Sequence, residues 1–496
     1  MRTDDLLAAL ALVASAGLCV AFRYLPMVDL PQHYAMVSIL LHHADPAWGF
    51  AQRYTFDFLG RPYATVYWLG AVLGWVMPLG AAMRIVVAAC TIAPLTGAFA
   101  LLVAMRRSRV WILPAIPLAF GSLWHWGFLN FLLGTGLFLG GLALVVRVAE
   151  RPRRAASLGL AVLGVFLLFT HFHGLVMLLV TAPLVAWGWR SQGDGLSPYV
   201  RTLGPLAPAA LAGAAFVALT WSQAVGTWSP MNPGVAERVV RFPEFLAGGA
   251  PAPWAEGTVA AFAVVAAAGV ALGGAPVPKR KLVALGIALC AQVGLYFALP
   301  LNTSTATYVS ARHALLIALL ILPLLPSPEG RLAWVPRALG TAVALGALIV
   351  MGRDLAGFDR EAREFDGVLA AMQPARRVAP LIWARGSDYT DARAFPYLHF
   401  AGYYQAAKGG ELARSFAVVW NVPIRYRADY ARYPIREDFE WNPSLFSAED
   451  ARHFDYVLVR GAREPSPALG LREVSRSGAF ALYEVARALP AGLPPP

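Results

Sequence analysis

The sequence contains few charged residues. Acidic and basic side chains make up 14% of its 496 residues, whereas roughly 25% is usual in soluble domains. Apolar residues account for 58% of the chain, above the roughly 45–50% of soluble domains. A water-soluble core does not absorb this surplus, so the excess apolar surface must face lipid. The shortage of charge therefore excludes an ordinary soluble protein.

Cysteine is also scarce. Cys19, Cys90 and Cys290 all lie within apolar runs, so neither a disulfide framework nor a zinc cluster is indicated. The sequence has no Gly-x-x-x-x-Gly-Lys-Ser/Thr loop, no His-Glu-x-x-His helix and no Gly-x-Ser-x-Gly elbow. Nothing in it points to an ATP-driven pump or a serine hydrolase.

Uncharged apolar runs fill the chain up to about residue 352. The hydrocarbon core of a bilayer accepts about 20 such residues per helix, and the sequence predicts an α-helical polytopic membrane protein. Arg2 precedes the first run but is opposed by Asp4 and Asp5, which favours a retained signal-anchor helix over a cleaved signal peptide. We expect about eleven spans, near residues 6–22, 84–104, 110–124, 128–146, 156–171, 174–190, 203–221, 258–274, 282–299, 311–325 and 335–351.

The basic residues lie in short clusters between these runs, at 106–109, 147–154 and 279–281, in a chain of net charge +12. This is the pattern of cytoplasmic loops under the positive-inside rule, and it does not indicate nucleic-acid binding. The same rule places the N-terminus in the cytoplasm of a multi-pass cell-membrane protein.

One apolar stretch, 63–79, is ambiguous, and the parity of the spans decides it. If the basic clusters are cytoplasmic, residues 23–62 lie outside only when 63–79 does not cross. Tyr63, Tyr67, Trp68 and Trp75 interrupt this stretch, and such residues concentrate at the headgroup level. We therefore expect a first outer loop at 23–83, with 63–79 along the outer surface. The loops 222–257 and 300–310 and the tail from Arg353 then also face outward.

The tail is polar and turn-rich, unlike the preceding 1–352 transmembrane domain. The pattern predicts helices over 353–372 and 397–408 and strands near 377–383, 416–420, 454–459 and 480–485. This is a small α/β domain at 353–490. The final residues, 491–496, end in three prolines and are expected to be disordered.

The first outer loop is the best candidate for chemistry. It opens with Asp29-Leu30-Pro31-Gln32-His33, where Pro31 suits a first helical turn and Asp29 and His33 would be neighbours four residues apart. One interpretation makes Asp29 an N-cap whose side chain accepts backbone hydrogen bonds. The other makes it a general base or metal-binding carboxylate at the lipid–water boundary. Both are compatible with the sequence.

The order of elements across roughly the first hundred residues resembles that of the GT-C superfamily of membrane glycosyltransferases. A first span is followed by an acidic residue, an amphipathic surface helix, Asp45-Pro46-Ala47-Trp48, Arg61-Pro62-Tyr63, an aromatic surface helix, and Arg84 opening the next span. The multi-span core and the outer α/β tail add to this likeness. The resemblance implies transfer of a sugar from a polyprenyl-phosphate carrier.

The resemblance also implies roles for individual residues. In that family the acid after the first span is the catalytic base, sometimes together with a divalent metal. Asp29 occupies this position in the sequence, and the metal that the resemblance implies is Mg or Mn. The second acid expected beside it is missing, because Leu30 and Pro31 follow. Asp57 is the candidate for a second carboxylate from the same loop. A base on the attacking side implies inversion.

A polyprenyl phosphate needs cations at the outer edge of the membrane, and Arg suits phosphate. Arg84 and the pair Arg312-His313 are placed there by the predicted topology, although an Arg near a helix end also snorkels to headgroups without binding a substrate. His399 is a further candidate that would reach over the membrane cavity from the tail. His171 and His173 form a His-x-His pair that binds a metal only in an extended turn; otherwise they are interfacial histidines.

The favoured function is thus a bacterial cell-envelope enzyme with a periplasmic or extracellular tail. Two alternatives stay open. The missing second acid fits a non-catalytic GT-C-like protein that binds or moves a lipid-linked glycan. A membrane transporter is disfavoured because few acidic residues fall inside the predicted spans. The sugar and its glycan, lipid or protein acceptor are not specified by the sequence.

Overall fold

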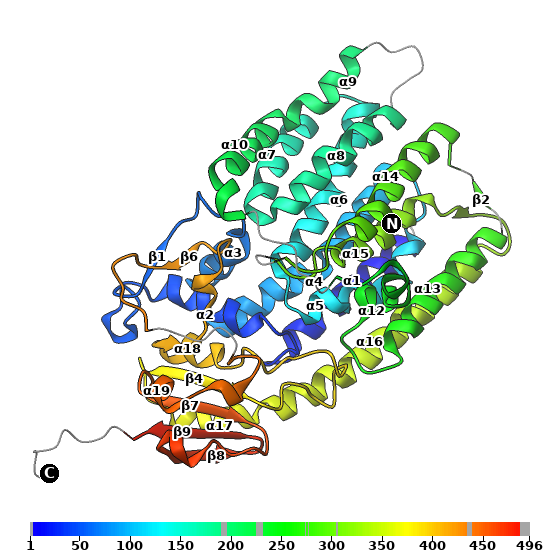
Figure 1. The fold of residues 1–496 in the computed structure, drawn as a ribbon. Helices are drawn as coiled ribbons and strands as arrows, with labels where there is room; N and C mark the ends of the chain where they lie inside the picture. The colour runs from blue at the N-terminus through cyan, green and yellow to red at the C-terminus, as the bar shows by residue number, and fades with distance from the viewer. Residues whose placement is uncertain are drawn as a thin grey trace, which may run out of the picture. The chain divides into compact units, whose positions relative to one another are not determined.

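The computed structural model describes residues 3–189, 196–224, 232–272, 274–275, 277–303, 306–433 and 439–486. The chain divides into two compact units. Figure 1 shows the chain coloured by residue number. The first, which we call the helical unit, comprises Met1–Phe22, Phe58–Val66 and Arg84–Asp354. The second, the mixed unit, comprises Arg23–Asp57, Tyr67–Met83 and Leu355–Pro496. Most of the first loop thus packs with the C-terminal part of the chain.

Long apolar helices build the helical unit, as the bilayer requires of any segment whose backbone polar groups must be satisfied internally. The helices are α1 (Thr3–Ala21), α4 (Leu79–Ala104), α6 (Leu129–Glu150), α7 (Arg154–Thr170), α8 (Phe172–Trp189), α9 (Leu196–Leu203), α10 (Ala207–Ala224), α13 (Trp254–Ala271), α14 (Lys279–Ala298), α15 (Arg312–Ile321) and α16 (Trp334–Ala362), with short α11 (Val235–Val240) and α12 (Phe242–Ala247) between them. Eight helical stretches among the described residues are long and apolar enough to cross a membrane.

The predicted spans coincide with these helices except at 311–325 and 110–124. At 311–325, α15 has 10 residues and is followed by η5 (Leu322–Leu324), so this helix is shorter than a span. Residues 110–124 do not form one helix: they fold as η2 (Arg109–Ile112), η3 (Ile116–Phe120) and α5 (Ser122–His125). Pro114 and Pro117 interrupt the backbone hydrogen-bond ladder here, and the segment is buried all the same. The ambiguous stretch forms α3 (Thr65–Gly74), whose 10 residues span about 15 Å, half the thickness of a bilayer core.

Two helices of this unit approach closely because glycine lines their contact. A Cβ atom at Gly97 of α4 would lie 2.3 Å from the carbonyl oxygen of Gly136 in α6, and one at Gly136 would lie 2.3 Å from that of Ala93. Small residues serve this purpose in membranes, where packing rather than water drives helix association.

Ion pairs join the N-terminus to the basic clusters. Asp4 pairs with Arg337 at 2.5 Å and Asp5 with Arg109 at 3.4 Å. Glu150, at the end of α6, pairs with Arg106 at 3.0 Å and Lys281 at 3.6 Å. The start of α1 and residues of all three predicted cytoplasmic segments therefore lie at one end of the helical unit.

The mixed unit contains a five-stranded sheet of order β5-β4-β7-β9-β8, of which β4, β7, β9 and β8 are labelled in Figure 1. Its strands are β4 (Arg377–Ile382), β5 (Glu411–Leu412), β7 (Tyr456–Arg460), β8 (Leu471–Ser477) and β9 (Phe480–Val485). β4 pairs in parallel with β5 and β7, while β9 pairs antiparallel with β7 and β8. The predicted α/β fold of the tail is confirmed.

Both faces of this sheet are covered, which explains why β7 is buried at every position. On one face lies α17 (Glu364–Ala371), whose Phe365 ring meets that of Phe480 at 5.4 Å. On the other, residues of β4, β7 and β9 share a core with aromatic side chains of the connecting segments: Tyr433, Phe439, Phe446 and Phe454.

Elements of the first loop complete the mixed unit. They are α2 (Leu30–Leu41), η1 (Pro46–Trp48) and β1 (Tyr54–Phe56), which pairs antiparallel with β6 (Ile424–Tyr426). In the tail, the predicted helix over 397–408 is regular only in α18 (Gly402–Lys408), and the predicted strand at 416–420 is wrong, since Phe416–Val418 forms the short helix η6. The predicted disorder at 491–496 lies outside the described residues.

Candidate active site

Asp29 precedes α2 at the N-cap position, yet its side chain makes no capping hydrogen bond. The carboxylate instead faces the tail, where its Oδ1 lies 3.2 Å from Nδ1 of His399. The interpretation that Asp29 acts as a side-chain N-cap is therefore wrong. Asp29 keeps 15% of its side-chain surface exposed, so the group is held but still accessible.

His399 connects Asp29 to a second carboxylate. Its Nε2 lies 2.9 Å from Glu440 Oε1, and Glu440 Oε2 lies 2.8 Å from Arg414 Nε. The His399 and Glu440 side chains are 11% and 6% exposed. We call this alternating series Asp29–His399–Glu440–Arg414 the ion chain. All four residues belong to the mixed unit.

The charges in the ion chain decide the protonation of its histidine. Burial opposes the charged imidazolium, but Glu440 and Asp29 outweigh it and raise the pKa of His399 to about 9. The pKa of Glu440 is lowered: its burial acts in the opposite direction, and the charges of His399 and Arg414 overcome that effect. At neutral pH the ion chain therefore consists of negative and positive groups in alternating order.

Close packing between α2 and α18 sets this geometry. A Cβ atom at Gly402 would lie 2.5 Å from the backbone of Pro31, so only glycine permits the approach. Ser38 Oγ donates to the carbonyl of Ala406 at 2.9 Å. The Gln32 amide donates to the carbonyl of Arg414 and accepts from the backbone N–H of Phe416, both at 3.1 Å. One residue of α2 thereby holds the segment that carries Arg414.

The chain on leaving α1 is anchored to the same unit. The backbone N–H of Tyr24 donates to Asp359 at 2.8 Å and its hydroxyl donates to Asp366 at 2.7 Å. Arg23 also pairs with Asp366, at 3.0 Å. These contacts hold Arg23 and Tyr24, shortly before Asp29, within the mixed unit.

The pH dependence of stability follows from the shifted histidine. A pKa raised from 6.5 to about 9 means that the native state binds a proton that the unfolded chain releases. The contribution is complete below pH 6.5, is lost as pH rises to 9, and amounts to at most about 3 kcal/mol. We expect the unfolding midpoint of the purified protein to fall between pH 6.5 and 9.5, and this fall to be smaller in His399→Gln but not in His453→Gln. An equal fall in all three proteins would contradict the assignment.

Of the other predicted residues in the mixed unit, His33 contacts Tyr67, with 3.1 Å between Nδ1 and the phenol oxygen. Burial and then the charge of Asp29 raise the pKa of Tyr67, which places this phenol within the electrostatic reach of Asp29. Asp57 lies beside the β1–β6 pair, where its N–H donates to the carbonyl of Pro423 at 2.8 Å. The second carboxylate of the ion chain is Glu440.

A separate polar cluster lies in the helical unit around Arg312, the first residue of α15. Arg312 Nη1 lies 3.4 Å from His171 Nε2. The His173 ring lies 6.0 Å from that of His171 and 4.9 Å from that of His313. Among the described residues, no hydrogen-bond partner is found for Arg312 Nε, His171 Nδ1, His173 Nε2 and His313 Nε2. The structure thus gathers four sequence-predicted residues, and the Arg312 Nε–H among them is an unpaired donor that suits an anion.

Arg84 belongs to the same unit, in α4, and its Nε also lacks a hydrogen-bond partner within the described residues. Phe128 and Phe131 lie under the Arg312 guanidinium at 5.3 and 5.6 Å from their ring centroids. Such aromatic contacts favour a cation held at a defined place.

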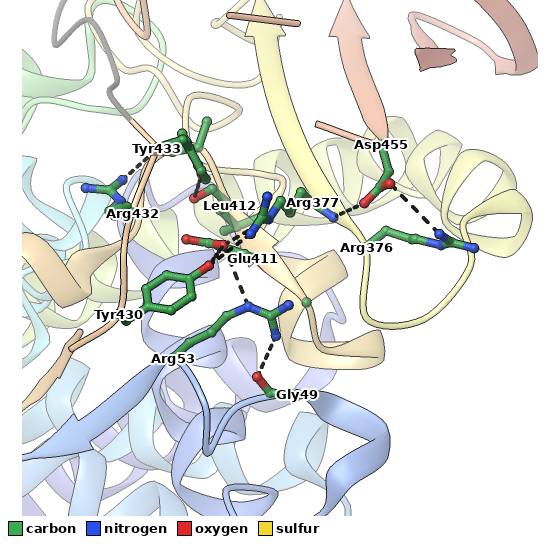
Figure 2. A network of polar contacts seen from close by, with 12 residues as sticks. Gly49, Arg53, Arg376, Arg377, Glu411, Leu412, Tyr430, Arg432, Tyr433 and Asp455 are labelled. Carbon is green, nitrogen blue, oxygen red and sulfur yellow. Dashed lines mark hydrogen bonds and ion pairs between the residues drawn. The ribbon is translucent and has the colours of Figure 1, made fainter. Parts of the chain in front are cut away.

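A third network, shown in Figure 2, surrounds Glu411 in β5, whose side chain is completely buried. Glu411 Oε2 accepts from the Tyr430 hydroxyl at 2.6 Å and pairs with Arg377 at 3.4 Å and Arg53 at 3.7 Å. Arg53 also donates to the carbonyl of Gly49. Since Arg53 comes from the first loop, this carboxylate ties the loop to the sheet.

The architecture is similar to that of solved membrane-protein structures. The crystal structure of ArnT from Cupriavidus metallidurans in the apo state matches with a TM-score of 0.55 and 13% identity, over 97% of each chain. The chain has the GT-C fold. The same ArnT bound to undecaprenyl phosphate matches with a TM-score of 0.48 and 13% identity over 99% and 98% of the two chains. The arabinofuranosyltransferase AftD from Mycobacteria, mutant R1389S, matches with a TM-score of 0.47 and 16% identity, over 97% of this chain and 41% of AftD. No family model and no curated protein matches the sequence.

The predicted GT-C resemblance is therefore confirmed at the level of the fold, but two members of the ion chain were not foreseen. Glu440 stands in Phe439-Glu440-Trp441 and Arg414 in Ala413-Arg414-Ser415, and neither segment has a recognisable motif. The missing neighbour of Asp29 was the only available signal, since it indicated that a partner must come from elsewhere in the chain.

The donor set around Asp29 does not fit the divalent metal that a GT-C fold can imply. Among the described residues, no group of three or more His, Cys, Asp or Glu side chains is placed to hold a metal ion. Asp29 and Glu440 approach different nitrogens of one imidazole ring, which keeps them from sharing an ion. A metal at His171 and His173 likewise lacks a third ligand of these types in the described part of the chain.

Proposed function

We propose that this protein is an inverting membrane glycosyltransferase that transfers a sugar from a polyprenyl-phosphate donor to an acceptor hydroxyl on the outer side of the bacterial cell membrane. The GT-C fold and the run of membrane-spanning helices support the class of enzyme. The observation that carries the proposal is the Asp29 carboxylate, directed away from its own helix amides and held by His399. Membership of the fold alone would leave the chemistry open.

In the proposed reaction, Asp29 accepts the proton of the acceptor hydroxyl as its oxygen attacks the anomeric carbon of the sugar. The bond between that carbon and the phosphate oxygen breaks, and its electron pair leaves with the polyprenyl phosphate. One glycosidic bond forms, with inversion, and the proton resides on Asp29. General-base catalysis of this kind contributes typically about 10²–10⁴-fold to the rate.

The departing phosphate gains negative charge, which preorganised cations stabilise. We assign this role to Arg312, with His313 next to it, and to Arg84, because the Nε–H groups of both guanidiniums have no hydrogen-bond partner among the described residues. His399 was a candidate for the same role in the sequence, but both its ring nitrogens face carboxylates. We therefore assign His399 the role of ionic partner to the Asp29 carboxylate.

The proposal is tested with the full-length protein in lipid nanodiscs. Lipid-linked sugars extracted from bacterial membranes are added together with an extract of envelope glycans, and polyprenyl phosphate is measured by mass spectrometry. We expect release of polyprenyl phosphate that depends on the protein and the acceptor. Binding of the lipid-linked sugars without release would identify a non-catalytic binder and overturn the proposal.

Arg312→Ala tests the assignment of the phosphate site. Removing a guanidinium that makes charge-assisted hydrogen bonds to phosphate costs about 1.5–3 kcal/mol, or roughly 10–100-fold in affinity. We expect the Kd for undecaprenyl phosphate to rise by this factor, while the exposed Arg331→Ala leaves it unchanged. An unaltered Kd in Arg312→Ala would show that this Arg only reaches the headgroups.

A further inference from the structure

The imidazole of His399 occupies the space between two acids. Its Nδ1 faces Asp29 and its Nε2 faces Glu440, at 3.2 and 2.9 Å. The two nitrogens point outward from opposite sides of a rigid ring, so the carboxylates lie apart with the ring between them. An ion that bound one of them would not reach the other without displacing the histidine.

Glu440 is itself held on both oxygens, by His399 on Oε1 and by Arg414 on Oε2. This buried acid therefore has a fixed position from which to orient the histidine. Aromatic packing adds to these contacts: Phe416 lies edge-on against the His399 ring at 5.7 Å, and His33 of α2 contacts the same phenyl ring at 5.6 Å. Among the described residues, the ionic partners of His399 are Asp29, directly before α2, and Glu440 from the tail.

We infer that His399, oriented by Glu440, is the cation that holds the Asp29 carboxylate for catalysis, in the place where a divalent ion would otherwise serve. His399 and Glu440 are thus positioning residues, and the reaction needs no added metal. The inference rests on the proposed function of Asp29. It also fits the missing second acid: Leu30 follows Asp29, and a single carboxylate is matched by a single imidazolium.

The geometry of the pair defines what His399 contributes. The contact to Nδ1 uses Oδ1 of Asp29, and we assign Oδ2 to the acceptor hydroxyl. A carboxylate fixed on one oxygen presents the other in a constant direction. Misplacing a reacting group by about 1 Å can cost about 10²-fold in rate, so loss of His399 should lower kcat and leave donor binding almost unchanged.

The first test measures metal dependence in the nanodisc assay described above. The wild-type protein is assayed in EDTA and again with excess Mg²⁺ or Mn²⁺. We expect rates that agree within twofold. A loss of activity in EDTA that either ion restores would overturn the inference. Mn²⁺ binding followed by electron paramagnetic resonance gives a readout apart from activity, and tightly bound Mn²⁺ that Asp29→Asn removes would also overturn it.

The second test replaces the positioning residues. His399→Gln keeps a hydrogen-bond donor without the charge, and Glu440→Gln removes the charge that orients His399. Both should lower kcat by roughly 10–100-fold with KM for the donor unchanged within twofold. The matched controls are His453→Gln and Glu449→Gln, which should behave as wild type. An unchanged kcat in His399→Gln would contradict the inference, as would a parallel change in kcat and KM.

Thermal unfolding distinguishes a positioning role from loss of structure. Should His399→Gln fail to fold, Glu440→Gln and the metal assay still decide the matter. The outcome is also separable from that for the proposed function. If Asp29→Asn retains full transfer, the base assignment fails. If Asp29→Asn is inactive but His399→Gln is fully active, only the inference about His399 fails.

Discussion

Asp29→Asn is expected to lower the rate of sugar transfer by about 10²–10⁴-fold, the usual contribution of a general base. Asn has nearly the same shape as Asp but accepts no proton at neutral pH. The variant also removes the ion pair with His399 at 3.2 Å, although Asp29 makes no capping hydrogen bond whose loss would destabilise α2. The protein should therefore still accumulate in membranes, and the defect should lie in kcat.

Release of polyprenyl phosphate, measured per mole of folded protein, checks this result. Asp429→Asn is the matched control, because Asp429 is exposed and pairs with Arg427. Asp57→Asn tests the second carboxylate that the sequence suggested, and a loss as large as that of Asp29→Asn would assign Asp57 to the chemistry. Undiminished transfer by Asp29→Asn would refute the proposed role of Asp29.

Glu411→Ala is expected to destabilise the mixed unit by about 3–5 kcal/mol, the usual effect of removing one partner from a buried ion pair. The Glu411 side chain is completely buried, and its loss leaves the guanidinium groups of Arg53 and Arg377 without their shared anion. Because Arg53 belongs to the first loop, the loop should also lose one of its contacts with the sheet (Figure 2).

The unfolding midpoint of the purified protein measures this effect. At about 2–4 °C per kcal/mol for a unit of 150–250 residues, a decrease of roughly 6–20 °C is expected. Glu449→Ala, at an exposed position of the tail, serves as the control and should change the midpoint little. A decrease no larger than that of the control would show that the network contributes nothing to stability.

The membrane spans could be predicted because the lipid core requires continuous apolar runs, which are visible in the sequence. A span needs about 20 apolar residues, and that requirement is visible without any knowledge of neighbouring helices. One exception, 110–124, satisfies the requirement in composition but contains Pro114 and Pro117, which divide it into short helices. Buried strands of the tail, such as β4 and β7, were equally visible as apolar runs. The segment that forms η6 was predicted as a strand because a short apolar run is compatible with either a strand or a short helix.

The candidate site is a different matter. The position of Asp29 after the first span identified it, but its surroundings come from segments several hundred residues away. Nothing in the sequence around Glu440 or Arg414 marks them as partners of His399. The same holds for Arg312 and the three histidines, each of which was noticed by itself. Only the chain's path through space brings them together.

The sequence by itself determined that this protein is a polytopic membrane protein with a polar α/β tail and that Asp29 is the acid to examine, because hydropathy, charge clusters and residue order are local properties. The tertiary structure decided which side chains face that acid. The close approach of Gly402 to Pro31 and the Gln32 hydrogen bonds bring the tail to the start of α2. The resulting pairing of Asp29 with His399 depends on packing between distant segments, which no local pattern encodes.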